Sequence, residues 1–254
     1  MLKKRLIFCL LYKDGYFVQS RNFVTNIIGD TDWIIKNYNF TNISNFIDEL
    51  IIIDISKNKK KKIFLKNVEK IIKKSFIPLS LGGGIDNMET AKLFLENMCD
   101  KVLINTSLFE NSKLISEIAN RYGNQSIVAS TDYKIEKKER VFFKKNGTKE
   151  IDMNFINVIK YIQKMPIGEF MINSIDRDGT GQGLDIEIIK YLKESNKPII
   201  ISGGAGNYKH FIKILSSKKI SAISTSNLLN FVGDGLKVLR EELLKKKIDL
   251  PVWE

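Results

Sequence analysis

The sequence is poor in the residues that mark several classes of protein: its 254 residues include two cysteines, four prolines and one histidine. Cys9 and Cys99 are too few for a disulfide framework, and their apolar surroundings are typical of core residues in a protein of the reducing cytoplasm. Because His210 has no second histidine to join it, we expect no metal centre, no Ser-His-Asp triad and no cofactor. No proline-rich or Gly/Ser-rich linker divides the chain, so we predict one domain over residues 1–254.

Long apolar runs are also lacking. No run is as long as a membrane span, and the basic start Met1–Arg5 leads into an apolar run without a small-residue cleavage site, so we expect neither a membrane protein nor a signal peptide. The formal net charge is +12, which is compatible with an anionic partner. The densest basic run, Lys57–Lys62, has no interleaved aromatic residue and matches no nucleic-acid motif, so we expect no nucleic acid. We expect the anionic partner to be a phosphorylated substrate rather than nucleic acid.

Short β-branched runs alternate with longer amphipathic segments. The predicted strands are Arg5–Leu11, Glu49–Ile55, Ile77–Leu81, Lys101–Ile104, Ser126–Thr131, Glu169–Ser174, Pro198–Ser202 and Ser221–Ser224. The predicted helices are Asn67–Lys74, Met88–Asn97, Asn154–Lys164, Ile186–Glu194 and Tyr208–Leu215. Apolar strands alternating with helices indicate a parallel sheet, and eight such units in about 250 residues favour a closed (β/α)8 barrel, the TIM-barrel class, over an open sheet.

The sequence also repeats itself. Pro78–Gly84 ends 21 residues before Asn105, and Pro198–Gly204 ends 21 residues before Thr225, at an offset of 120 residues. Two further matches are Leu11–Lys13 with Asp132–Lys134, and Ile53–Ile55 with Ile175–Arg177. A repeat of this length is too long for a solenoid unit, so we predict a barrel made of two repeated half-barrels.

Glycine motifs follow the predicted strands at their carboxyl ends, where barrels of this class carry their active sites. Glycine lets backbone N–H groups approach a phosphate, and a following helix N-terminus favours the anion. Two copies at matched spacing predict two phosphate half-sites, and therefore a ligand with a phosphate at each end. The first half-site comprises Gly83, Gly84, Asn105 and Thr106. The second comprises Asp178, Gly179, Gly203, Gly204, Thr225 and Ser226.

Asp132 is the candidate catalytic residue. It ends the fifth predicted strand and should point into the barrel mouth, where it could act as a general acid or base. Its mate in the repeat is Leu11, which can do neither. Asp54 and Asp176 are also mates, and a structural role for them, binding backbone amides or fixing a loop, competes with a chemical one.

Charged residues mark the opposite, amino-terminal end of the strands. Arg5, Glu49, Lys101 and Glu169 stand at or near the starts of predicted strands one, two, four and six. Two cations and two anions could close the barrel bottom as a salt-bridge ring, either as a stabilising plug or as a gate.

The motifs resemble those of the cyclase subunit of imidazole glycerol phosphate synthase, from histidine biosynthesis, over nearly the whole chain. The residues that carry the resemblance include Lys13–Gly15, Asp54–Ile55, Gly82–Ile85, Ser174–Thr180 and Ser202–Gly206. The resemblance implies a glutaminase partner docked on the barrel bottom, near Asp100, whose ammonia passes a gate and the barrel core to the substrate. It assigns the gate to Arg5, Glu49, Lys101 and Glu169, and the substrate phosphates to the two half-sites.

The departures from that family are local and chemical. The family has two catalytic aspartates, which correspond to Leu11 and Asp132, and a catalytically important lysine where this chain has Gln19. Losing a general acid or base costs about 10²–10⁴-fold in rate, so little imidazole formation is expected.

A divergent branch of the family also ends its first strand in a leucine run: the acetamidino-modification proteins of surface-sugar (lipopolysaccharide or flagellar) pathways. In that branch, barrel and glutaminase are thought to supply ammonia to an ATP-dependent amidotransferase. We therefore predict ammonia delivery for acetamidino modification. The histidine-pathway cyclase, an ammonia-dependent lyase, and a non-catalytic scaffold are the alternatives.

Overall fold

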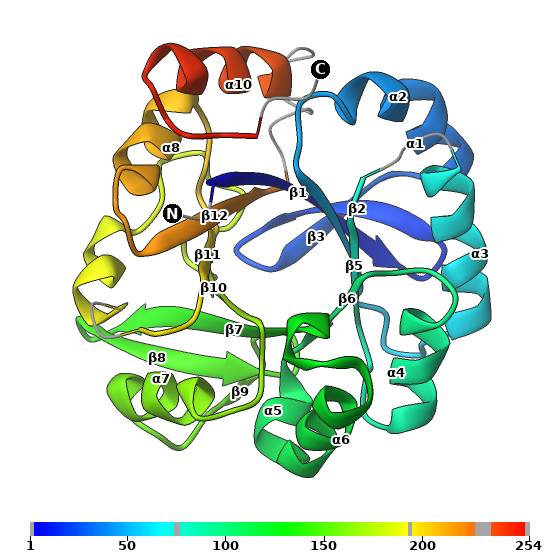
Figure 1. The fold of residues 1–254 in the computed structure, drawn as a ribbon. Helices are drawn as coiled ribbons and strands as arrows, with labels where there is room; N and C mark the ends of the chain where they lie inside the picture. The colour runs from blue at the N-terminus through cyan, green and yellow to red at the C-terminus, as the bar shows by residue number, and fades with distance from the viewer. Residues whose placement is uncertain (1–2, 74–76, 193–194, 227–234, 252–254) are drawn as a thin grey trace.

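The computed structural model describes residues 3–73, 77–192, 195–226 and 235–251. Eight parallel strands close into a barrel surrounded by helices, as predicted (Figure 1). In order around the barrel the strands are β1 (Arg5–Lys13), β4 (Glu49–Asp54), β5 (Leu79–Gly82), β6 (Lys101–Ile104), β7 (Ile127–Glu136), β10 (Glu169–Ser174), β11 (Ile199–Ser202) and β12 (Ile220–Thr225). The β12–β1 and β10–β7 pairings complete the ring.

Among the α-helices of the described residues, four overlap the predicted amphipathic segments and five were not predicted. They are α1 (Thr31–Asn37), α2 (Phe40–Ile43), α3 (Lys61–Ile72), α4 (Met88–Leu95), α5 (Thr106–Glu110), α6 (Ser112–Tyr122), α7 (Phe155–Gln163), α8 (Tyr208–Leu215) and α10 (Gly235–Lys245). The segment Ile186–Leu192 forms a tight 3-10 helix instead of an α-helix. Lys74, Lys193 and Glu194, the ends of two predicted helices, lie outside the described residues. Within the described ranges, every helix is too short or too polar to cross a lipid bilayer.

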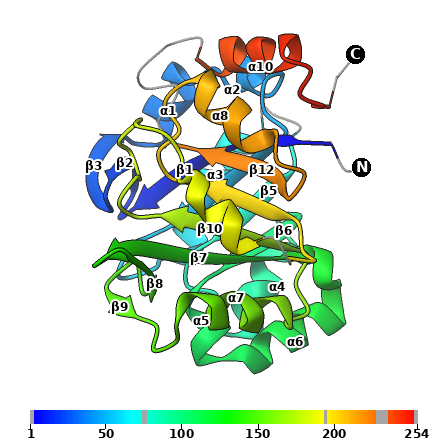
Figure 2. The ribbon, with the colours of Figure 1, turned by 90° about the vertical axis from the view of Figure 1, so that its left-hand side faces the viewer.

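Two antiparallel hairpins extend barrel strands beyond the carboxyl-terminal rim, and the sequence did not predict them. Strand β1 continues into β2 (Tyr16–Arg21) and β3 (Val24–Gly29), while β7 continues into β8 (Glu139–Lys144) and β9 (Lys149–Glu150). Both lie at the same end of the barrel (Figure 2). Because each follows the first strand of its half, the hairpins repeat the two-fold organisation expected from the sequence.

The core has two layers. The larger one lies between the strands and the helices, and Cys99 packs against it half-buried. The inner layer fills the barrel itself with side chains from every barrel strand except β5: Ile7, Cys9, Ile51, Leu103, Val128, Met171, Ile200 and Ala222. Cys9 is buried there, as its apolar surroundings predicted. The barrel interior is therefore a packed apolar column and not an open pore.

The backbone ladder corrects one match between the halves. Ile55 N donates to Tyr12 O (2.8 Å), and Ile175 N donates to Tyr133 O (2.9 Å), so Ile55 and Ile175 are the equivalent positions. The prediction that Asp54 and Asp176 are mates was wrong by two residues, because a shared Ile-Asp pair misaligned the strands. The equivalent of Asp176 is Ser56: each accepts a backbone N–H at the carboxyl end of the first strand of its half, Asp176 from Ile135 and Ser56 from Asp14.

Candidate functional site

The carboxyl ends of the strands surround a cavity of about 740 Å³, lined by residues of both half-barrels. Asp132 lies in its wall and is 8% exposed. Its carboxylate accepts hydrogen bonds from Asn105 Nδ2 (2.7 Å) and Asn173 Nδ2 (3.1 Å). Burial raises the pKa of Asp132 to about 7, against the two amide hydrogen bonds, which lower it. Such a carboxyl can give or take a proton near neutral pH.

Leu11 stands in the same cavity, half-buried, and packs against the inner core layer. It occupies the position on β1 that Asp132 occupies on β7, so the mouth holds an ionisable group from one half-barrel and an apolar one from the other. Gln19 lies on β2, paired with Asn26 of β3.

The first predicted half-site lines this large cavity. Gly83 and Gly84 have φ angles of 112° and 66°, and a Cβ at Gly83 would lie 2.2 Å from Asp54 O, so no larger residue fits that position. Thr106 opens α5, and its hydroxyl accepts a hydrogen bond from Lys145 N (3.2 Å), which leaves the hydroxyl proton to donate. The Asn105 side chain turns instead to Asp132, so a phosphate would meet Asn105 through its backbone.

The second half-site is a separate pocket of about 30 Å³ between the ends of β10, β11 and β12. Its lining includes the predicted residues Asp178, Gly179, Gly203, Gly204, Thr225 and Ser226. The Thr225 hydroxyl is buried and has no hydrogen-bond partner among the described residues, as expected of a donor that awaits a ligand.

Asp178, a predicted member of the second half-site, lines this pocket and also contacts the first hairpin. Its carboxylate accepts hydrogen bonds from the Ser20 hydroxyl and from Phe23 N (3.2 Å), and its burial raises its pKa. An ionised carboxylate repels a phosphate, and these contacts tie Asp178 to the first hairpin. The Asp-Gly-Thr string of the motif therefore anchors the rim through Asp178, while the neighbouring glycine lines the pocket.

The hairpin tips tie the two halves together across the mouth. Asn22 Nδ2, at the tip of the first hairpin, donates to Ile175 O (3.2 Å) and Asp176 O (2.7 Å), which follow β10. Asn146 Nδ2, at the tip of the second, donates to Ile55 O (3.4 Å), which follows β4. Both asparagines have positive φ angles, 52° and 56°, typical of tight hairpin turns. In the sequence, the Asn146-Gly147 pair was an available signal for the second tip.

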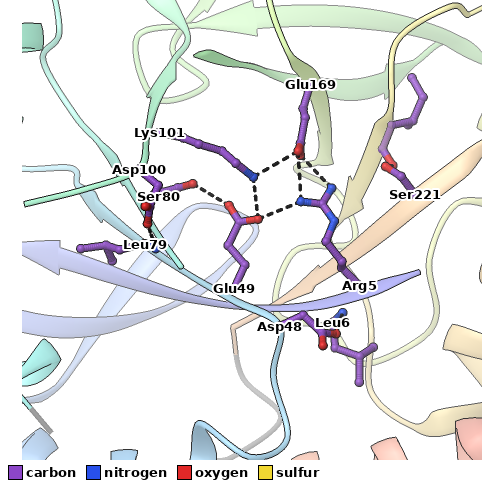
Figure 3. A network of polar contacts seen from close by, with 11 residues as sticks. Arg5, Leu6, Asp48, Glu49, Leu79, Ser80, Asp100, Lys101, Glu169 and Ser221 are labelled. Atoms are coloured by element: carbon purple, nitrogen blue, oxygen red, sulfur yellow. Dashed lines mark hydrogen bonds and ion pairs between the residues drawn. The ribbon is translucent and has the colours of Figure 1, made fainter. Parts of the chain in front are cut away.

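At the amino-terminal end, Arg5, Glu49, Lys101 and Glu169 form a closed ring of ion pairs, called the charged ring below (Figure 3). Arg5 binds Glu169 with two nitrogens (2.8 and 3.0 Å) and Glu49 with one (2.9 Å). Lys101 Nζ closes the ring on Glu49 (2.9 Å) and Glu169 (3.1 Å). Burial opposes ionisation of Glu169, but the hydrogen bonds and charge of Arg5, with help from Lys101, outweigh it and lower the pKa.

Neighbouring residues hold the charged ring in place. The Ser80 hydroxyl donates to the second oxygen of Glu49 (2.5 Å), and Asp100, exposed at the same end, accepts from Leu79 N (2.8 Å). Asp48 is buried beside them in an ion pair with Arg240 of α10 (3.0 Å), a contact between distant segments that the sequence did not predict.

The remaining candidates have structural contacts. Asp54 accepts from the backbone and hydroxyl of Ser56, and His210 Nδ1 accepts from Gly206 N (3.2 Å) at the start of α8. No cluster of side chains with metal-ligating chemistry occurs in the described part of the chain.

The fold and site define a class: a two-fold (β/α)8 barrel with an apolar interior, a charged ring at one end and glycine-lined pockets around a buried carboxyl at the other. The sequence matches the family of histidine biosynthesis proteins over residues 5–231. The chain belongs to this family, among its members similar to the HisF subunit of imidazole glycerol phosphate synthase.

The relatives align along nearly their whole length. A "Putative imidazole glycerol phosphate synthase subunit hisF2" of Parasynechococcus marenigrum is 42% identical over 100% of this chain and 95% of its own. The imidazole glycerol phosphate synthase subunits HisF of Thermotoga sp. (strain RQ2) and Sulfurisphaera tokodaii are each 34% identical. The alignments cover 98% of this chain and 98% of the first, and 99% of this chain and 100% of the second.

Proposed function

We propose that this chain is the ammonia-accepting barrel subunit of a glutamine amidotransferase complex, and that its ammonia serves the acetamidino modification of a surface sugar. The observation that carries the proposal is Leu11 in the mouth opposite Asp132. Imidazole formation in the resembled cyclase uses a carboxylate on each side, and a leucine side chain can neither take nor give a proton. An ammonia conduit needs no such pair.

The route for ammonia starts at the charged ring. A glutaminase docked at this face, near Asp100, would release ammonia beside Lys101 and Glu169. Behind the ring lies the inner core layer, and Cys9, Leu103 and Met171 belong both to that layer and to the wall of the mouth cavity. Neutral ammonia can cross such an apolar column between side chains that move briefly apart, whereas an ammonium ion would lose its hydration there. An ATP-dependent amidotransferase would take up the ammonia at the mouth.

A second candidate is the histidine-pathway cyclase itself, and one observation favours it. Asp132 has a pKa near 7, two oriented amides and two glycine-lined pockets around it, which is a complete half of a proton-transfer site. A site that had lost all chemistry would have no need of a buried carboxyl with a raised pKa.

The experiment that separates the two is an imidazole glycerol phosphate assay with excess ammonium and the bis-phosphorylated ribulosyl substrate. We expect no turnover by the wild type and a gain of at least tenfold over background in Leu11→Asp/Gln19→Lys. Leu11→Asn/Gln19→Lys is the matched control, because asparagine has the size of aspartate but cannot titrate. Robust wild-type turnover would overturn the proposal in favour of the cyclase.

A companion experiment tests the complex and excludes a scaffold. Glutaminase activity of the genomically adjacent partner should rise when the barrel is added, and ammonia should reach the mouth less efficiently in Glu49→Gln. A strain carrying Gly84→Asp should lose the acetamidino sugar. An unchanged sugar in that strain would favour a scaffold without a ligand of its own.

A further inference from the structure

The basic run that the sequence analysis set aside as unrelated to nucleic acid reaches the mouth of the barrel. Lys57 and Lys59 follow β4 and line the same cavity as Asp132 and the first half-site. Lys57 is exposed, whereas Lys59 is half-buried. The run is therefore not a uniform solvated surface: Lys59 and Lys61 are both half-buried, and of these two it is Lys59 that lines the cavity.

Lys59 lies directly on the glycine turn of the first half-site. A Cβ at Gly84 would meet Lys59 Cδ at 2.3 Å and Cε at 2.8 Å, so the methylene chain packs against the backbone of Gly84. The ammonium at its end donates to Ser56 O at 2.5 Å, which fixes its position at the cavity wall. Glycine at position 84 is needed for this packing as well as for its φ of 66°.

The ammonium keeps donors free for a ligand. An ammonium has three N–H donors, and within the described residues the Lys59 ammonium donates one hydrogen bond, to Ser56 O. Burial lowers the pKa of Lys59, whereas the nearby charges of Asp54 and Asp14 raise it. A partly desolvated cation in a cavity interacts more strongly with an anion than one in open solvent does.

Among the described residues, no such cation lines the second half-site. The residues that line its pocket are glycine, serine, threonine, alanine and Asp178. Arg177, next in sequence, directs its guanidinium to Gly183 O (2.9 Å). The two half-sites thus share glycine turns with positive φ angles, but only the first has a lysine ammonium in its wall among the described residues.

We propose that Lys59 is a phosphate ligand of the first half-site, which makes this half-site selective for a terminal phosphomonoester dianion, while the second binds its anion through neutral donors. The inference rests on the proposed function only in placing phosphates at the two half-sites. It assigns a direction to the ligand: the end with the higher negative charge lies beside Lys59, and the end with lower charge lies beside Thr225.

The test uses inorganic phosphate as the probe, titrated into the purified chain and followed by calorimetry or 31P NMR. Gly204→Ala removes the second half-site, since a Cβ there would lie 2.3 Å from Gly183 O, and isolates the first. In that background, Lys59→Met keeps the aliphatic stem over Gly84 and removes the charge. We expect it to weaken phosphate binding at least tenfold, as for a lost charge-assisted hydrogen bond.

The matched control is Lys62→Met, an exposed lysine of the same run, which should change binding less than twofold. Lys59→Arg should keep most of the affinity, and circular dichroism verifies that each variant is folded. Equal binding by Lys59→Met and Lys62→Met overturns the inference, as does the absence of phosphate binding by the single variant Gly204→Ala. The titration contains neither glutaminase nor ammonia, so its result is independent of whether the chain delivers ammonia.

Discussion

Replacing Asp132 by asparagine is expected to stabilise the fold above neutral pH and to have almost no effect near pH 4. The folded state raises the pKa of this carboxyl from an ordinary 3.8 to about 7. Between those values the folded protein holds a proton that the unfolded chain releases, so this group lowers the stability as pH rises through the window and levels off above it. Three pKa units at 1.36 kcal/mol each set a ceiling of about 4 kcal/mol.

The structure indicates how asparagine fits at this position. Asn105 Oδ1 is buried without a hydrogen-bond partner among the described residues, while Asn105 Nδ2 faces Asp132. Rotating the Asn105 amide by half a turn lets its oxygen accept from the new asparagine, whose own oxygen still accepts from Asn173. Because both hydrogen bonds remain but lose the assistance of a charge, we expect a net gain of about 1–3 kcal/mol at pH 8, which is roughly 2–10 °C in Tm for a chain of this size.

Urea denaturation of wild type and Asp132→Asn at pH 4.5, 6 and 8 measures this gain, with the exposed Asp152→Asn as a control for the change in net charge. The stability difference should grow with pH between 4.5 and 8. A difference that stays constant with pH, or a destabilised variant at pH 8, would refute the assignment of a desolvated carboxyl to the mouth.

Two further predictions concern the ion pairs at the amino-terminal end. Glu169→Gln should destabilise the protein by about 2 kcal/mol at pH 7 and by much less below pH 4. The lowered pKa of Glu169 stabilises the fold above the pKa of the unfolded chain, and this contribution is lost as the pH falls through the pKa of the folded state. Denaturation at pH 7 and 3.5 tests this prediction, and an equal loss of stability at both pH values would contradict it. Arg240→Met leaves Asp48 buried without its partner and should cost about 3–5 kcal/mol, whereas adding Asp48→Asn should recover part of the loss; full additivity of the two changes would argue against a coupled pair.

The sequence predicted the barrel because its strands are short β-branched runs that stay buried on both faces. This pattern can be recognised from the sequence alone, without knowing which residues are in contact. The charged ring was also predictable, since each member begins a strand and parallel strands in a barrel begin at one end. The hairpins were not, because β2 and β3 lie on the rim and their residues alternate too weakly between buried and exposed.

Two residues of the site have contacts that the sequence could not predict, for a common reason. Asp178 stands inside a phosphate-type motif, but only the fold brings Ser20 and Phe23 to its carboxylate. Lys59 stands in a run of lysines, and only the path of the chain after β4 places its side chain, half-buried, in the wall of the cavity. In both cases the sequence shows the charged residue, but the residues that it contacts, Ser20 and Phe23 for Asp178 and Gly84 for Lys59, are distant in sequence.

The tips of the hairpins have a consequence for how the mouth opens. Each half-barrel fastens its own hairpin to the rim of the other half, Asn22 to Ile175 and Asn146 to Ile55. The arrangement is a mutual clasp, in which neither hairpin can lift without releasing a loop that frames the opposite pocket. We therefore expect a half-barrel made alone to lack the partner loop for its hairpin tip, and the intact barrel to order both rims together.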